Sequence, residues 1–239
     1  MNTQLNKLKV KIFADGADVN EMIRLSKDPM IKGLTTNPTL MKKAGILDYA
    51  KFAGEVLNEI KTKPISFEVF SDSLMEMERQ AELISSWGQN VYVKVPITNT
   101  QGISTHKLVK NLVKNNIKVN ITAIMTLNQV KIISESLDVA VPNFISIFAG
   151  RIADTGRDPI GVMRESIEFL RPIGSSEVIW ASPRELLNIF QASEIGCHVI
   201  TATTDILKKL EIVGYDLDQF SLDTVKMFYK DAQESNFNI

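Results

Sequence analysis

The segment VYVKVPIT, residues 91–98, decides the fold, and Lys94 lies at its centre. Its β-branched residues and the turn-forming residues on both sides predict a short strand. Successive side chains of a strand point to opposite faces, so the three valines share one face while Tyr92 and Lys94 share the other. Desolvation of a lysine between valines disfavours the charged ammonium, and the neutral amine is the form that attacks a carbonyl to give a Schiff base. The alternative is a lysine at a sheet edge whose amine reaches the solvent, so the rest of the chain must decide.

Composition narrows the class of protein. The chain has 239 residues, 44% hydrophobic content and a net charge of −1, values typical of globular proteins. The absence of a basic excess argues against nucleic acid or an anionic membrane as a partner. No apolar signal segment or 18-residue apolar run occurs, so we expect a cytoplasmic protein. A single cysteine (Cys197) and two distant histidines (His106 and His198) argue against a disulfide framework or zinc cluster, and we expect no metal.

Strand-like and helix-like segments alternate along the whole chain. Eight strands alternating with helices in about 240 residues predict a (β/α)8 TIM barrel, as one domain over residues 1–239. A doubly wound open sheet is the rival, but the first strand lacks the glycine fingerprint of a dinucleotide site. The predicted strands are Lys9–Ala14, Ile31–Thr35, Ile65–Val69, Val91–Pro96, Val119–Ala123, Phe144–Phe148, Glu177–Ala181 and His198–Ala202. The predicted helices are Ile46–Ile60, Met75–Trp87, Thr105–Lys114, Leu127–Ser136, Pro159–Leu170, Arg184–Ile195 and Ile206–Glu211, and Asp18 with Glu21 predicts a capping box before them.

An extra helix follows the last predicted strand, over residues 219–235, with Ser221 as its expected N-cap. An apolar stripe of Leu222, Val225, Phe228 and Tyr229 runs along it. A stripe of this kind needs a partner surface, either on the barrel or on a neighbouring subunit.

Polar residues interrupt the apolar pattern at corresponding places in five strands around the lysine strand. If the aliphatic faces pack on the helices, these residues line the barrel interior near the carboxyl ends of the strands, where barrel active sites lie. Each of them alone could be a turn former or a surface residue, but together they indicate a site. They are Asp15, Thr35, Asn37, Ser66, Glu68, Asn120, Thr122 and Ser146.

Two loops after the late strands point to an anionic ligand. Gly150-Arg151 follows the sixth strand, and Ala181-Ser182-Pro183-Arg184 follows the seventh and is expected to open a helix. Such loops commonly bind phosphate, and arginine offers the planar set of donors that phosphate accepts. The alternative is an ordinary pair of loops with surface arginines.

Seven short motifs, in order from the first strand to the seventh, resemble the transaldolase family and cover about three quarters of the chain. The chain length resembles the short members of the family, which include the fructose-6-phosphate aldolases. The motifs are FADGAD (13–18), GLTTNPT (33–39), FEV (67–69), VYVKVP (91–96), VNITAIMT (119–126), ISIFAGRI (145–152) and WASPRE (180–185).

The resemblance implies a cofactor-free class I mechanism in which Lys94 forms a Schiff base with C2 of fructose 6-phosphate. Asp15 would take the C4 hydroxyl proton, and glyceraldehyde 3-phosphate would leave. The dihydroxyacetone unit retained on the lysine would then attack erythrose 4-phosphate to give sedoheptulose 7-phosphate. Further roles are implied by position: Glu68 and Thr122 hold a proton-shuttling water; Asn37, Thr35, Asn120, Ser146 and Phe148 bind the substrate; and Arg151, Ser182 and Arg184 bind its phosphate.

The finer assignment depends on a few positions. The aldolases of this group resemble one another in having glutamine where this chain has Glu68, tyrosine where it has Phe148 and alanine where it has Ser146, which favours transaldolase. Pro183 stands where an aromatic residue is usual, which puts the acceptor preference in doubt. The alternatives are an aldolase that releases free dihydroxyacetone and a non-catalytic sugar-phosphate-binding barrel, although the latter predicts a degraded lysine or acid/base set. The resemblance to short members also implies a homo-oligomer, pentameric or decameric, with the terminal helix on a neighbour.

Overall fold

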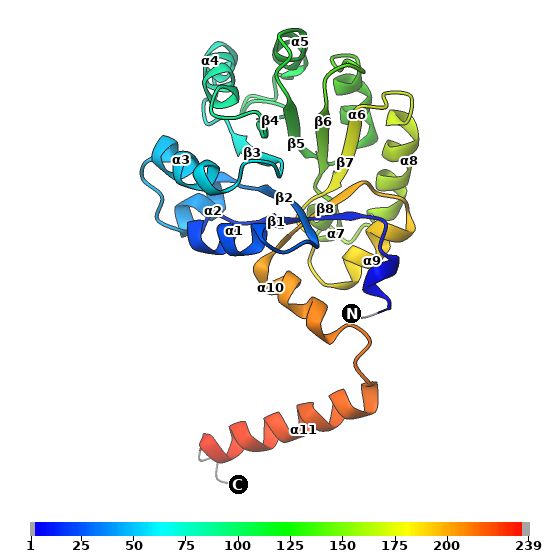
Figure 1. Ribbon diagram of the computed structural model, residues 1–239. Helices are drawn as coiled ribbons and strands as arrows, with labels where there is room; N and C mark the ends of the chain where they lie inside the picture. The colour runs from blue at the N-terminus through cyan, green and yellow to red at the C-terminus, as the bar shows by residue number, and fades with distance from the viewer. Residues whose placement is uncertain (1–2, 236–239) are drawn as a thin grey trace.

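Eight parallel strands close into a barrel in the computed structural model, which describes residues 3–235 (Figure 1). Each strand pairs with the next along the chain, and β8 pairs with β1 to close the ring. The (β/α)8 prediction is therefore confirmed. The strands are β1 (Lys11–Asp15), β2 (Ile31–Thr35), β3 (Ile65–Glu68), β4 (Val91–Pro96), β5 (Val119–Ile124), β6 (Asn143–Ile147), β7 (Ser176–Trp180) and β8 (Val199–Thr203).

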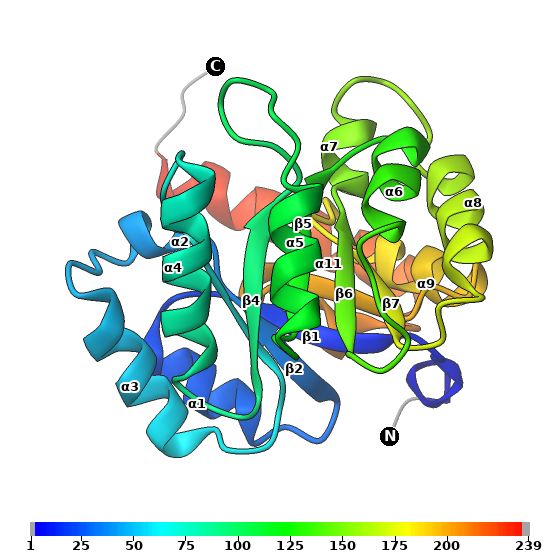
Figure 2. The ribbon, with the colours of Figure 1, turned by 90° about the horizontal axis from the view of Figure 1, so that it is seen from above.

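Helices surround the barrel and cover the outer faces of the strands (Figure 2). The aliphatic side chains of the strands, such as Val93 and Val95, are buried against these helices. None of the helices within residues 3–235 is long and apolar enough to cross a membrane. The helices are α1 (Val19–Ser26), α2 (Pro38–Lys43), α3 (Tyr49–Glu59), α4 (Leu74–Ser85), α5 (His106–Lys114), α6 (Leu127–Ser134), α7 (Ala149–Ala153), α8 (Ile160–Leu170), α9 (Leu187–Glu194), α10 (Thr204–Lys208) and α11 (Leu217–Glu234), with 3-10 turns at Leu5–Lys7 and Lys209–Ile212.

The starts of two helices show how local chemistry sets the boundaries. Asp18 caps α1 by accepting a hydrogen bond from the Glu21 amide, which is one half of the predicted capping box; the Glu21 carboxylate pairs with Arg24. Asn37 caps α2, a helix the sequence analysis did not predict, and Pro38 occupies its first turn. A proline there costs the helix no hydrogen bond, because the amides of the first turn have no intrahelical partner.

Away from the carboxyl ends of the strands, the barrel interior is filled by a separate apolar cluster. It consists of Phe13, Phe144, Ile179 and Val199, and Tyr92 packs against it. The rings of Phe13 and Phe144 meet edge to face at 5.5 Å. A Cβ at Gly33 would lie 2.5 Å from the Phe13 ring, so only glycine allows this ring to sit against β2. The cluster fills the interior toward the amino ends of the strands, and the polar residues of the barrel gather at the carboxyl ends.

The helix α11 extends away from the barrel (Figure 1), and none of its residues is buried. It begins earlier than predicted, and its N-cap is Asp216, which accepts from the Gln219 amide at 2.9 Å. The expected cap, Ser221, is therefore wrong and lies inside the helix. Carboxylates at and just after the cap, at Asp216 and Asp218, suit the positive end of the helix dipole.

Candidate active site

A cavity of about 520 Å³ opens at the carboxyl ends of the strands. All of the predicted site residues line it except Ser66 and Asn120, which are buried and hydrogen-bonded to each other. Strands β1 to β8, α2, α7 and α10 or their adjoining loops contribute to the lining. The lining residues are Asp15, Thr35, Asn37, Pro38, Thr39, Leu40, Glu68, Lys94, Thr122, Ala123, Ser146, Phe148, Arg151, Ala181, Ser182, Pro183, Arg184, Thr201, Thr203, Asp205 and Ile206.

Lys94 is buried at the centre of β4, with 6% of its surface exposed. The strand register places it beside Glu68 of β3, and its Nζ lies 3.2 Å from Glu68 Oε2. The same Nζ donates a hydrogen bond to the Thr36 carbonyl oxygen at 2.9 Å. The side chain does not extend to bulk solvent, so the edge-lysine alternative is excluded by the geometry.

Tyr49, the first residue of α3, holds the backbone of Glu68 in place. Its hydroxyl accepts a hydrogen bond from the Glu68 amide at 2.7 Å and donates one to the Glu68 carbonyl oxygen at 3.1 Å. Burial raises the pKa of Tyr49, so the phenol stays neutral and can donate and accept at once. The sequence analysis places Tyr49 inside the predicted helix Ile46–Ile60 and gives no sign of this contact.

Asp15, at the end of β1, is the second carboxylate of the cavity. Thr35 Oγ1 donates to its Oδ1 at 2.7 Å, and Asn37 Nδ2 donates to its Oδ2 at 3.4 Å. Burial raises the pKa of Asp15, although the charge of Lys94 and the two hydrogen bonds act in the opposite direction. A carboxylate with raised proton affinity is suited to accept a proton from a bound hydroxyl.

A second set of polar groups joins β3, β5 and β6. Asn120 Nδ2 donates to Ser66 Oγ at 2.9 Å, and Ser146 Oγ donates to Asn120 Oδ1 at 2.7 Å. Asn120 therefore lies behind Ser146 and is connected to the cavity by this hydrogen bond. Thr122 lines the cavity, and its buried Oγ1 has no hydrogen-bond partner within residues 3–235. Its neighbour Ala123 has φ 62°, at a register irregularity of β5, and irregularities of this kind often re-aim side chains next to active sites.

The three predicted phosphate ligands lie together at the mouth of the cavity. Arg151 is part of α7, and its guanidinium lies 5.9 Å from the centre of the Phe148 ring. Arg184 Nε donates to Asp154 Oδ1 at 2.9 Å, and Arg184 Nη2 donates to the other carboxylate oxygen. The hydrogen bonds from Arg184 hold the pKa of Asp154 below its usual value. The guanidinium keeps further N–H groups for a ligand, because an arginine has five.

The segment that carries Ser182 and Arg184 is a loop and does not open a helix, so that part of the prediction is wrong. Helix α9 begins only at Leu187, and the Asn188 side chain accepts from the Arg184 and Glu185 amides instead. Ser182 adopts φ 56°, a conformation that a helix start does not contain. Ser182 and Arg184 thus lie in a turn in which the Asn188 side chain accepts hydrogen bonds from two backbone amides.

Strand β8 supplies lining residues that the sequence analysis did not name. Thr201 and Thr203 line the cavity, and so does Asp205 of α10. The alternation of Val199, Thr201 and Thr203 with Ile200 and Ala202 is the same signal that identified the other polar strands. Within residues 3–235 no three His, Cys, Asp or Glu side chains gather as possible metal ligands.

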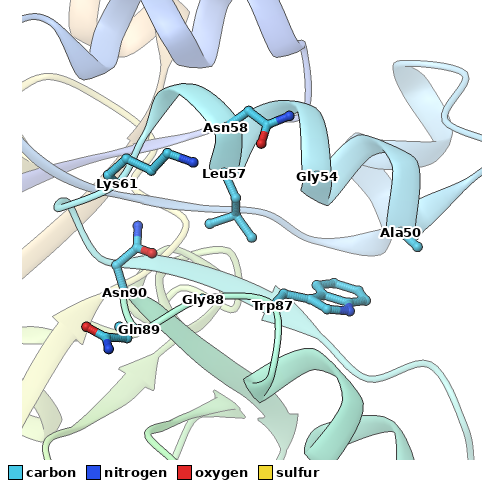
Figure 3. A pocket seen from close by; sticks show the side chains of 9 residues that line it. All are labelled: Ala50, Gly54, Leu57, Asn58, Lys61, Trp87, Gly88, Gln89 and Asn90. Atoms are coloured by element: carbon cyan, nitrogen blue, oxygen red, sulfur yellow. The ribbon is translucent and has the colours of Figure 1, made fainter.

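A second hollow, of about 400 Å³, lies between α3 and the turn before β4 (Figure 3). Side chains of α3 form one side of it, and residues 87–90 form the other. Its lining includes Trp87, Lys61 and three amides but no carboxylate or imidazole. The hollow offers no acid/base pair, so the barrel cavity is the candidate active site.

Comparison with known proteins agrees with the geometry. Residues 12–239 match the family model described as Transaldolase/Fructose-6-phosphate aldolase. The chain belongs to this family. A probable transaldolase of Streptococcus agalactiae is 35% identical over 193 residues, which cover 80% of this chain and 85% of the relative. Probable transaldolases of Chelativorans sp. and Thermoanaerobacter sp. are 34% and 30% identical, over 91% and 93% of this chain and 97% and 98% of their own lengths.

Proposed function

We propose that this member of the family is a transaldolase, which moves a dihydroxyacetone unit from a ketose phosphate to an aldose phosphate through a Schiff base on Lys94. The observation that carries the proposal is the buried Lys94 amine, 3.2 Å from the Glu68 carboxylate in a polar cavity with arginines at its mouth. In this mechanism Glu68 takes the proton that Lys94 must lose before it attacks the ketose carbonyl. The same carboxyl group then returns a proton to the C2 hydroxyl, which leaves as water when the iminium forms.

Charge explains why the next step suits this cavity. Asp15 takes the proton of the C4 hydroxyl, the C3–C4 bond breaks, and its electrons neutralise the iminium to give an enamine. An iminium and a carboxylate thus become two neutral groups, together with a released aldehyde. A buried site disfavours charged groups, and burial already raises the pKa of Asp15. The acceptor aldehyde reverses these steps, because its oxygen takes the proton back from Asp15 as the new C–C bond forms.

The choice of transaldolase over fructose-6-phosphate aldolase rests on how long the enamine survives. An aldolase must protonate the enamine to release dihydroxyacetone, whereas a transaldolase must keep it for the acceptor. Phe148 lines the cavity without a hydroxyl group, and Ser146 donates its proton to Asn120. Neither side chain supplies a proton to the enamine, which supports transfer over release.

The test follows glyceraldehyde 3-phosphate release from fructose 6-phosphate with and without erythrose 4-phosphate. Release that depends on the acceptor, with sedoheptulose 7-phosphate as product, is expected. Release without an acceptor, with free dihydroxyacetone, would assign the aldolase activity instead. Borohydride trapping with fructose 6-phosphate should label Lys94, should fail in Lys94→Ala and should persist in Lys118→Ala, whose amine lies outside the cavity on the Gln89 carbonyl. An unlabelled wild-type protein would leave only the non-catalytic sugar-phosphate-binding barrel.

We also propose that a second copy of this chain covers α11, in a pentamer or decamer. The stripe residues Leu222, Val225, Phe228 and Tyr229 are 47 to 68% exposed, and apolar stripes of this kind mark interaction surfaces. Light scattering should show an oligomer for the wild-type chain. Phe228→Glu should shift it toward smaller species, whereas Lys230→Glu on the same helix should not. A wild-type monomer would contradict the proposal.

A further inference from the structure

Three polar groups from adjacent strands form a chain of hydrogen bonds beside the cavity. Strand β1, which ends in Asp15, lies between β2 and β8 in the barrel. Thr35 Oγ1 of β2 is 2.7 Å from Asp15 Oδ1 and 2.6 Å from Thr201 Oγ1 of β8. Both threonines are buried, with 2% and 5% of their surfaces exposed. The two strands that flank Asp15 thus reach each other through their side chains.

The direction of these hydrogen bonds follows from the number of protons. An ionised carboxylate only accepts, and a threonine hydroxyl has a single proton to donate. With Asp15 ionised, Thr35 must give its proton to Asp15 Oδ1. The short contact between the two threonines then requires Thr201 to donate to Thr35. The protons of both hydroxyls are therefore directed in series toward Asp15.

Thr35 provides the main restraint on the carboxylate. The only other side-chain hydrogen bond to Asp15 within residues 3–235, from Asn37 Nδ2 to Oδ2, is long at 3.4 Å. Thr35 can fix Asp15 only if its own hydroxyl is held in one rotamer. Thr201 holds it there by donating a hydrogen bond to Thr35 Oγ1. Hydrogen bonds in a series also strengthen one another in a low-dielectric interior.

We propose that Thr201 is a positioning residue, which acts through Thr35 to hold the Asp15 carboxylate for the proton transfer of C3–C4 cleavage. The inference rests on the proposed function, in which Asp15 takes the C4 hydroxyl proton. Thr201 exchanges no proton with the substrate: the proton moves from the C4 oxygen to Asp15, and the hydroxyls keep theirs. Its effect is confined to the steps in which Asp15 takes part.

If Thr201 had a purely structural role, its methyl group rather than its hydroxyl would matter. In the register of β1 and β8, Thr201 lies opposite Phe13 of the apolar cluster, so its methyl group could matter for packing alone. Valine keeps the shape of threonine and removes the hydroxyl, whereas serine keeps the hydroxyl and removes the methyl. The two substitutions therefore separate the roles.

The experiment measures two steps in each variant: adduct formation, by borohydride trapping with fructose 6-phosphate, and cleavage, by glyceraldehyde 3-phosphate release in a single turnover. Thr201→Val should slow cleavage about 3- to 10-fold, with trapping rate and KM within about twofold of wild type. Thr201→Ser should keep both rates within about twofold. Thr201→Ala removes the same hydroxyl and serves as the second variant, with the same pattern, if the valine protein does not fold.

Two results would overturn the assignment of Thr201. Normal cleavage in the valine variant with slow cleavage in the serine variant would assign the residue to packing. Equal slowing of trapping and cleavage in Thr201→Val would show that the hydroxyl acts on Lys94 or on the whole cavity. Absence of trapping in the wild-type protein is a separate outcome, since it defeats the Schiff-base proposal before any Thr201 variant is compared.

Discussion

The close contact between α7 and the loop after β7 gives a sharp test of the proposed phosphate-binding site. A Cβ added at Gly150 would lie 1.6 Å from the Ser182 carbonyl oxygen and 2.7 Å from its carbon, and 3.3 Å from Arg184 Nε. Real Cβ atoms essentially never come closer than 3.0 Å to such a backbone atom. Gly150→Ala must therefore move the two segments apart by about 1.4 Å, the difference between the two distances. The hydrogen bond from the Gly150 amide to the Ala181 carbonyl would break as well.

The expected loss follows from this displacement. A misplacement of about 1 Å at a positioning group lowers rates by about 100-fold. Because Ser182 and Arg184 move away from Arg151, kcat/KM for fructose 6-phosphate should fall by about that factor, mostly through KM. Overpacking should also destabilise the fold by about 1–3 kcal/mol, which lowers Tm by about 2–4 °C for each kcal/mol in a protein of this size.

The assay compares borohydride trapping with fructose 6-phosphate and with unphosphorylated fructose, together with thermal melting. Fructose should be trapped by Gly150→Ala within about threefold of the wild-type rate, because Lys94 and Glu68 are undisturbed. Gly161→Ala is the matched control: no atom lies within 4 Å of its added Cβ, and it lies inside α8, where alanine should stabilise by about 0.5–1 kcal/mol. An equal loss of trapping rate with both sugars, or a normal trapping rate with fructose 6-phosphate, would refute the proposal that α7 and the loop after β7 bind phosphate.

Three further predictions test other parts of the site. Arg151→Ala should raise the KM for phosphorylated sugars about tenfold or more, because the variant loses a charge-assisted hydrogen bond to the phosphate. An unchanged KM in steady-state assays would contradict the proposed role of Arg151 in phosphate binding. Because burial raises the pKa of Asp15, ionised Asp15 lowers stability; this penalty is absent below about pH 4 and grows as the pH rises through the folded pKa. Asp15→Asn should therefore melt above wild type at pH 7 by a margin that shrinks toward pH 4, and calorimetry showing a pH-independent margin would oppose this. Tyr49→Phe should lower the free energy of unfolding by about 1–3 kcal/mol in urea, since it leaves the Glu68 amide and carbonyl unpaired, and an unchanged urea midpoint would argue against this contact.

Most of the site was predictable because strand parity is a local property. The alternation around Lys94, and around Asn120 and Thr122, told which side chains face the barrel interior before any contact was known. The same rule applied to β8 would have identified Thr201. Boundaries were less predictable: the starts of α2 and α11 depend on capping contacts such as that of Asp216 with the Gln219 amide.

The sequence by itself determined the eight-fold alternation, the inward direction of Lys94 and the presence of polar groups around it, since these depend on residues a few positions apart. The tertiary structure alone decided which of these groups touch. The contacts of Thr35 with Thr201, of Arg184 with Asp154 and of Tyr49 with Glu68 join segments that are 166, 30 and 19 residues apart. Such contacts depend on strand register and on how closely loops approach, and both are set by the packing of the whole barrel rather than by any one segment.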